Sequence, residues 1–132
     1  MHFIIGGRHM GKLRYAFSLY GDDIAVCDLA VLDLKEKSAD SAISNALVID
    51  NLQAGVRNLL SNRICAEDFW ESRLSRWRDK VLIGEEVGAG IVPMDPFERE
   101  WRDRTGFLYQ KVAERADIVD RIWAGLPTRL KG

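Results

Sequence analysis

The sequence is poor in the residues that mark several classes of protein. Only 2 of its 132 residues are cysteines, and 3 are prolines. Cys27 and Cys65 lie far apart and form no C-x-x-C pair, so neither a zinc site nor a redox dithiol is indicated. We expect both to be reduced thiols in buried or half-buried positions.

An excess of one charge and a long apolar run are also missing. The 19 basic and 20 acidic residues give a net charge of −1, which excludes a strong overall field for nucleic acid or an anionic membrane. No apolar run approaches the roughly 20 residues that cross a bilayer, and the run at the start is too short for a secretory signal. We therefore expect a cytoplasmic protein with neither a nucleic acid nor a membrane as its partner.

What the chain does contain is enough apolar sequence for one core. Hydrophobic residues make up 47% of the chain, and its length is that of one ordinary domain, so we predict a single domain over residues 1–132. Apolar runs predict strands at 3–5, 24–29, 46–49, 81–83 and 118–123, the last followed by a turn at 125–127. Helical spacing predicts helices at 11–20, 52–60, 69–77 and 96–116.

The order of these elements predicts the fold class. Strands that alternate with helices indicate a three-layer α/β fold with a mostly parallel sheet, because parallel strands need crossover connections. Residues 33–45 are polar and poorly periodic, so we expect a loop with at most a short helix there.

Two of the predicted helices carry further local signals. Asp95, Pro96 and Glu98 combine an N-cap acid, a proline in the first turn and a glutamate at the third position, which predicts a helix start with a capping box. Charged residues of the 69–77 region and just beyond it are interpreted as a solvated face: Glu71, Arg73, Arg76, Arg78 and Asp79.

The most informative motif lies between the first predicted strand and the first predicted helix. It matches the pattern G-x-x-x-x-G-K and predicts a phosphate-binding loop made of Gly6, Gly7, Arg8, His9, Met10, Gly11, Lys12 and Leu13. Glycines let the backbone curl around phosphate, the helix N-terminus supplies a positive dipole, and Lys12 adds a point charge. The alternative is a glycine-rich turn that binds only an adventitious anion.

A metal ion would need ligands from outside this loop. Such loops carry Ser or Thr after the lysine, whose hydroxyl binds Mg²⁺, whereas Leu13 offers no oxygen. Asp50 ends the apolar run 46–49 and could hold Mg²⁺ or its water beside the loop. The candidate catalytic residues are therefore Lys12 and Asp50, with Asp50 as the candidate metal ligand.

Longer segments resemble one known family. Residues 81–93 (VLIGEEVGAGIVP) and 97–110 (FEREWRDRTGFLYQ) are similar to the E-V-G-x-G-I-V-P and F-R-D-x-x-G-x-x-N-Q blocks of the adenosylcobinamide kinase/adenosylcobinamide-phosphate guanylyltransferase family of cobalamin synthesis. Residues 50–60, 113–117 and 124–132 resemble further segments of that family. The resemblance covers 1–20 and about 46–132.

The resemblance implies a P-loop NTPase-like sheet fold that binds ATP or GTP, with Mg²⁺ as a further candidate ligand. It also implies a corrinoid alcohol as acceptor, which is phosphorylated and then joined to GMP, and a homo-oligomer that is often a trimer. Carried over by position, Gly6, Gly11 and Lys12 would bind phosphates, Asp50 would support the metal, and Glu86 would lie near the active cleft.

The sequence departs from this family in one further place. The family's guanylylated histidine lies in a segment that is represented here by residues 29–45, which contain no histidine. His2 and His9 do not match it, so a covalent nucleotidyl intermediate is not expected; His9 either shapes the loop, touches phosphate or faces solvent.

Three interpretations stay open: a phosphoryl-transfer enzyme, a nucleotide-binding sensor or assembly subunit, and a scaffold whose loop is empty and whose Trp101, Trp123 and Arg-rich helix form an oligomer contact.

Overall fold

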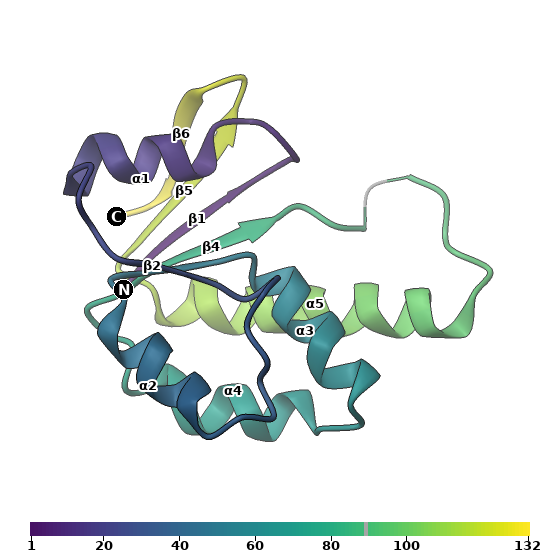
Figure 1. Cartoon of the computed structure of the whole chain (residues 1–132). Coiled ribbons are helices and arrows are strands. Elements are labelled where there is room, and N and C mark those ends of the chain that lie inside the picture. The colour runs from purple at the N-terminus through teal and green to yellow at the C-terminus, as the bar shows by residue number, and fades with distance from the viewer. Residues whose placement is uncertain (89) are drawn as a thin grey trace.

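A computed structural model describes residues 1–88 and 90–132, and Figure 1 shows a sheet with helices on both faces. The strands are β1 His2–Gly6, β2 Val26–Asp28, β3 Val48–Asp50, β4 Val81–Glu85, β5 Ile118–Trp123 and β6 Leu126–Lys131. The helices are α1 Lys12–Tyr20, α2 Ser38–Asn45, α3 Leu52–Ser61, α4 Ala66–Leu74 and α5 Pro96–Arg115. Ala89, part of the family-like block at 81–93, lies outside the described residues.

The sheet is mostly parallel, which confirms the predicted α/β class. Its strand order is β2-β3-β4-β1-β5-β6, and within the part of the chain that the structure describes only the β5–β6 pair is antiparallel. The carboxyl ends of β3 and β1 are therefore separated by β4. The strand β6 was not predicted, because all six of its residues are exposed and its sequence carries no buried alternation; pairing with β5 makes it a strand.

Residues alternate between the two faces of the sheet and build two unequal apolar clusters. The larger cluster includes Phe3, Ile49 and Leu82 and is covered by α2, α3, α4 and α5. Among the described helices, α1 alone covers the smaller cluster, and its Ala16 is fully buried. Its other buried members are Ile4, Val48, Val81, Ile83 and Ile122. Helices on both faces complete the three layers that the order of elements predicts.

The helix boundaries differ from the predicted ones where packing decides. The polar segment 33–45 contains α2, because Ala39 and Ile43 lie four residues apart and are both buried in the larger cluster. Helix α4 ends at Leu74, so Trp77 is buried after the helix rather than within it. Within the described residues, no helix is both long and apolar enough to cross a membrane.

The predicted start of α5 is confirmed, but only half of its capping box forms. One Asp95 carboxylate oxygen accepts hydrogen bonds from the backbone N–H groups of Phe97, at 2.8 Å, and Glu98, at 3.4 Å. The Glu98 carboxylate does not reach back to the N-cap. It accepts two hydrogen bonds from the Arg57 guanidinium at 2.7 Å each, which ties α5 to α3.

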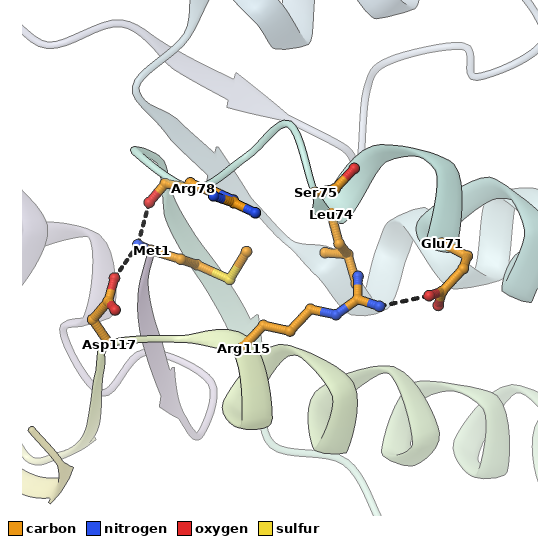
Figure 2. Close-up of a pocket in the computed structure, with 7 residues that line it drawn as sticks. All are labelled: Met1, Glu71, Leu74, Ser75, Arg78, Arg115 and Asp117. Atoms are coloured by element: carbon orange, nitrogen blue, oxygen red, sulfur yellow. Dashed lines mark hydrogen bonds and ion pairs between the residues drawn. The ribbon is translucent and has the colours of Figure 1, made fainter.

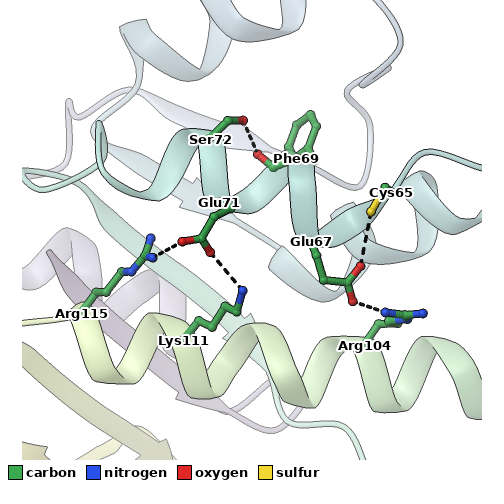
Figure 3. A network of polar contacts seen from close by, with 8 residues as sticks. All are labelled: Cys65, Glu67, Phe69, Glu71, Ser72, Arg104, Lys111 and Arg115. Carbon is green, nitrogen blue, oxygen red and sulfur yellow. Dashed lines mark hydrogen bonds and ion pairs between the residues drawn. The ribbon is translucent and has the colours of Figure 1, made fainter.

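The predicted solvated charged face on α4 is confirmed for Glu71, whose side chain is 52% exposed, but not for Arg73, whose side chain is only 19% exposed. Glu71 pairs with Lys111 at 3.0 Å and Arg115 at 2.5 Å, across to α5 (Figure 3). Arg73 pairs with Asp40 of α2. These two charges also pair with side chains of α5 and α2, which are partners that the sequence of a single helix does not reveal. Both cysteines are free; Cys27 is buried as expected, whereas Cys65 is exposed.

Candidate functional site

The phosphate loop connects the carboxyl end of β1 to the start of α1. Gly6 lies so close to β5 that an added Cβ would be 2.5 Å from the Ile122 carbonyl oxygen, so only glycine fits. Gly11 and His9 both have positive φ, at 95° and 60°, which for His9 is a strained conformation. The loop therefore keeps a backbone shape that most sequences avoid.

Lys12 points into the loop. Its ammonium donates a hydrogen bond to the Gly7 carbonyl oxygen at 2.7 Å. Burial lowers the pKa of Lys12, and the nearby carboxylates of Glu85, Asp50 and Glu86 act against that shift. The Lys12 ammonium is therefore held against the backbone of the loop, with three carboxylates nearby.

A cavity of about 330 Å³, which we call the phosphate cavity, opens beside the loop. Its lining includes six of the predicted site residues: Arg8, His9, Gly11, Lys12, Leu13 and Asp50. Gly6, Gly7 and Met10 shape the loop but do not line the cavity. Arg14, Asn51 and Glu85 also line it and were not predicted.

Glu86, which was predicted to lie near the cleft, is close to the loop without lining the cavity. Its backbone N–H donates to the Gly6 carbonyl oxygen at 2.9 Å. Its carboxylate accepts hydrogen bonds from Arg121 of β5 at 2.5 and 3.2 Å. The preceding residue, Glu85, is the one that faces the cavity. It ends β4 as Asp50 ends β3, and this shared position is the sequence signal that could have identified it.

The carboxyl ends of β2, β3 and β4 are joined by a chain of hydrogen bonds. Asn51, which has a φ of 60°, donates through its side chain to an Asp28 carboxylate oxygen at 2.7 Å. Gln53 donates to the Asn51 amide oxygen at 3.0 Å and accepts from the backbone N–H of Glu85 at 2.9 Å. Tyr109 of α5 then donates to the Glu85 carbonyl oxygen at 2.6 Å. This chain holds the backbone that carries Asp50 and Glu85.

Asp50 and Glu85 are the candidates for contact with a metal ion. Burial raises the pKa of Asp50, while a hydrogen bond from the Asn51 backbone N–H, at 2.8 Å, and the charge of Lys12 lower it. Among the residues that the structure describes, no three acidic, histidine or cysteine side chains are grouped to hold a metal by themselves. Mg²⁺ commonly keeps several waters and binds one or two carboxylates together with substrate phosphates. The residues present fit that arrangement and do not form an all-protein metal cage.

A larger cavity of about 530 Å³ lies at the opposite end of the strands (Figure 2). It is lined by residues such as Met1, Leu74 and Arg115, and none of the phosphate loop takes part. Arg115 already pairs with Glu71 there, and Asp117 pairs with the Met1 amino group at 2.9 Å. Size alone therefore does not mark the functional site, because these charges are already neutralised by one another.

Comparison with known proteins supports a phosphate-handling family, and it does so from residues outside the phosphate loop. Residues 30–130 match the sequence model of the family described as cobinamide kinase / cobinamide phosphate guanyltransferase. The phosphate loop lies outside this matched range. Its geometry is therefore an observation separate from the family match.

Two curated proteins are similar over part of the chain. One is the bifunctional adenosylcobalamin biosynthesis protein CobP of Pseudomonas aeruginosa, 42% identical over 52 residues, which are 39% of this chain and 30% of the relative. The other is the bifunctional adenosylcobalamin biosynthesis protein CobU of Salmonella typhimurium, 39% identical over 51 residues, which are 39% of this chain and 28% of the relative. The matched segments thus span less than a third of either relative.

Proposed function

Because the chain belongs to the cobinamide kinase / cobinamide phosphate guanyltransferase family, we propose that it binds the triphosphate of ATP or GTP in the phosphate cavity. The observation that carries this proposal is the placement of Lys12 inside a strained loop, at the edge of a cavity that Asp50 and Glu85 face. Loop amides and the dipole of α1 would add positive potential for phosphate. Nucleotide binding would thus depend on the positive potential of Lys12, the loop amides and α1, and on a loop whose shape is set before the ligand arrives.

We propose further that the reaction attempted at this site is phosphoryl transfer to the hydroxyl of a corrinoid, in an impaired form. Lys12 would stabilise charge on the transferring group, and Asp50 with Glu85 would hold the ion or its waters. Leu13 lines the cavity where a hydroxyl ligand is expected, so one metal contact is missing. The loop after β4 exposes Ile91, Val92 and Met94, an apolar surface that suits a large, partly apolar acceptor.

The second candidate is a nucleotide-binding sensor or assembly subunit without transfer activity. Leu13 and the absence of histidine from residues 29–45 both favour it. The two candidates share the binding step and differ in turnover. In either case we propose a homo-oligomer, by analogy with the family.

Calorimetry with ATP, GTP and inorganic tripolyphosphate tests the binding step. Lys12→Ala removes the loop charge and should weaken all three ligands by at least about tenfold, since hydrogen bonds to charged groups contribute about 1.5 to 3 kcal/mol. Lys35→Ala, at an exposed lysine outside the cavity, is the matched control and should bind as the unmodified chain does. Equal affinities in Lys12→Ala and the unmodified chain would refute the proposal.

Replacement of Leu13 separates the two candidates. Leu13→Ser supplies the missing hydroxyl, and Leu13→Ala removes the same apolar contacts without supplying it. If the site attempts transfer, Leu13→Ser should increase both the Mg²⁺ dependence of binding and the consumption of ATP or GTP in the presence of cobinamide, whereas Leu13→Ala should not. Unchanged turnover in all three proteins favours the sensor or subunit.

A further inference from the structure

We propose that Arg121 is a positioning residue for triphosphate binding: through its ion pair with Glu86, it keeps a third carboxylate from opposing the ligand at the phosphate loop. Neither residue lines the phosphate cavity, so both act from outside it. The inference rests on the proposed function, since it concerns the ligand proposed for that cavity. It adds to that function a control of the charge that the ligand meets.

The ion pair bridges the strand that leads into the phosphate loop. In the sheet, β1 lies between β4 and β5 (Figure 1). Glu86 directly follows β4, and Arg121 belongs to β5, in register with Ile5 of β1. The Arg121 guanidinium donates through Nε and Nη2 to the two Glu86 carboxylate oxygens, at 2.5 and 3.2 Å. The two side chains therefore meet across β1, close to where the loop begins.

Glu86 is bonded to the loop through its backbone, but its side chain is turned away from the cavity. Its backbone N–H donates to the Gly6 carbonyl oxygen at 2.9 Å. Successive side chains along a strand point to opposite faces of the sheet, and the preceding residue, Glu85, lines the cavity. On β5, Ile122 belongs to the smaller cluster, so its neighbour Arg121 points to the opposite face. Glu86 and Arg121 thus share the face that the cavity does not use.

The charge of Glu86 nevertheless reaches the loop. It is one of three carboxylates whose charge acts on the Lys12 ammonium. The other two, Asp50 and Glu85, already place negative charge at the cavity, and a triphosphate brings several more negative charges. Repulsion between charges is screened only over a Debye length of about 8 Å at physiological ionic strength. By neutralising Glu86, Arg121 removes one source of that repulsion.

The geometry of the pair suits control of charge rather than support of the fold. The Arg121 side chain is 50% exposed and that of Glu86 is 30% exposed, and such accessible pairs add little to stability. A guanidinium that contacts both oxygens of a carboxylate nevertheless fixes the direction of both groups. Removing either partner should therefore change the affinity for an anion more than it changes the free energy of unfolding.

The two single variants test this by the sign of their effects. Calorimetry with inorganic tripolyphosphate in the absence of Mg²⁺ measures the affinity of the loop alone. Arg121→Met keeps an unbranched side chain and leaves the Glu86 charge unpaired, so we expect the affinity to fall by about three- to tenfold. Glu86→Gln leaves the Arg121 charge unpaired, so the affinity should rise by at least about twofold. If the pair only braced the loop, both variants would weaken binding.

Two further variants make the comparison specific. Arg115→Met is the matched control, because Arg115 also pairs with a glutamate at the surface and lies at the opposite end of the strands. It changes the net charge equally and should alter the affinity by less than about twofold. The double variant Glu86→Gln/Arg121→Met removes both charges and should bind about as tightly as the unmodified chain. Urea denaturation should show that all these variants remain folded.

The inference is wrong if Arg121→Met binds tripolyphosphate no more weakly than Arg115→Met does. It is also wrong if both single variants weaken binding, or if the double variant stays as weak as Arg121→Met, because Arg121 would then act without Glu86. In each of these cases the proposed function stands, since the unmodified chain still binds. If the unmodified chain does not bind tripolyphosphate, the proposed function fails and the inference fails with it.

Discussion

The two faces of the sheet are covered in very different ways. Four helices cover one face with a large apolar cluster that contains Trp70 and Trp77, whereas α1 alone covers the other with a small one (Figure 1). The thinly covered face carries the helix that follows the phosphate loop. The helix that follows the candidate phosphate loop is therefore attached to the face with the smaller apolar cluster.

A buried polar cluster reinforces α1 on the thin face. Asp120 of β5 is only 1% exposed, and it accepts hydrogen bonds from His2 at 2.7 Å, Tyr15 at 3.0 Å and Arg129 at 2.6 Å. The other ring nitrogen of His2 bonds the Tyr20 hydroxyl at 2.7 Å. Tyr15 of α1 thus bonds directly to the Asp120 carboxylate of β5, and Tyr20 of α1 is linked to it through His2 of β1. Arg129 of β6 bonds the same carboxylate. Apolar packing thus secures one face of the sheet, and charge-assisted hydrogen bonds supplement a small apolar cluster on the other.

The largest effect should come from the apolar face. Trp70→Ala removes an indole that is 3% exposed and contacts Phe69 and Trp77, with ring centroids 4.9 and 5.9 Å away. We expect the free energy of unfolding to fall by about 3 to 5 kcal/mol, because a cavity is left behind. Urea denaturation measures this loss.

The matched control on that face is Trp70→Phe. It keeps an aromatic ring and removes the indole N–H, which is buried without a hydrogen-bond partner among the described residues. We expect a smaller loss than in Trp70→Ala, because the phenyl ring fills part of the space that the indole occupied. A loss of unfolding free energy as large as that of Trp70→Ala would show that an aromatic ring at this position does not replace the contribution of the indole.

Asp120→Asn tests the polar face. The amide has one acceptor oxygen where the carboxylate accepts three hydrogen bonds, so we expect a loss of about 2 to 3 kcal/mol in the free energy of unfolding. Because α1 carries Lys12, the tripolyphosphate affinity measured by calorimetry should also fall. Trp70→Phe should leave that affinity unchanged. If Asp120→Asn also leaves it unchanged, the polar cluster does not influence phosphate binding at the loop.

The pH dependence of stability gives a smaller effect with a defined sign. Burial of Asp120 opposes its ionisation, but hydrogen bonds from Arg129, His2 and Tyr15 outweigh this and hold the pKa of Asp120 below its usual value. Its contribution is therefore present above the unfolded pKa of about 3.9 and is lost as the pH falls through the folded pKa. The difference in stability between the unmodified chain and Asp120→Asn should narrow below about pH 4, and a constant difference would contradict this.

Glu71→Gln should have the smallest effect of the series. The Glu71 carboxylate is half exposed, and its pairs with Lys111 and Arg115 join α4 to α5 at the surface. Exposed ion pairs contribute little and are screened by salt. The melting temperature should fall less than in Asp120→Asn, and the difference from the unmodified chain should vanish at high salt. A loss that persists at high salt would show that this pair is not screened as an exposed pair is.

Features that depend on neighbouring residues could be predicted from the sequence. The phosphate loop is contiguous from Gly6 to Leu13, and Asp50 follows directly from a buried run, so both were recognised from local pattern. Asp95 was recognised as an N-cap for the same reason, and its hydrogen bonds confirm it. Glu98 was assigned to the wrong partner, because Arg57 belongs to another helix.

Features that depend on the order of the strands in the sheet could not be predicted from the sequence. Glu85 reaches the phosphate cavity because β4 lies between β3 and β1, and no local pattern encodes that order of strands. The strand β6 has no buried residue to mark it, and the role of Asp120 depends on three partners spread between residues 2 and 129.

The sequence by itself determined the alternation of strands and helices and the glycine-rich loop between β1 and α1, because hydrophobic period and glycine content act over a few residues. Only the tertiary structure decided which carboxylate faces Lys12, which face of the sheet is secured by charge, and where a second cavity opens. Those properties arise when segments distant in the chain meet, and the free energy of such contacts depends on burial that no single segment creates alone.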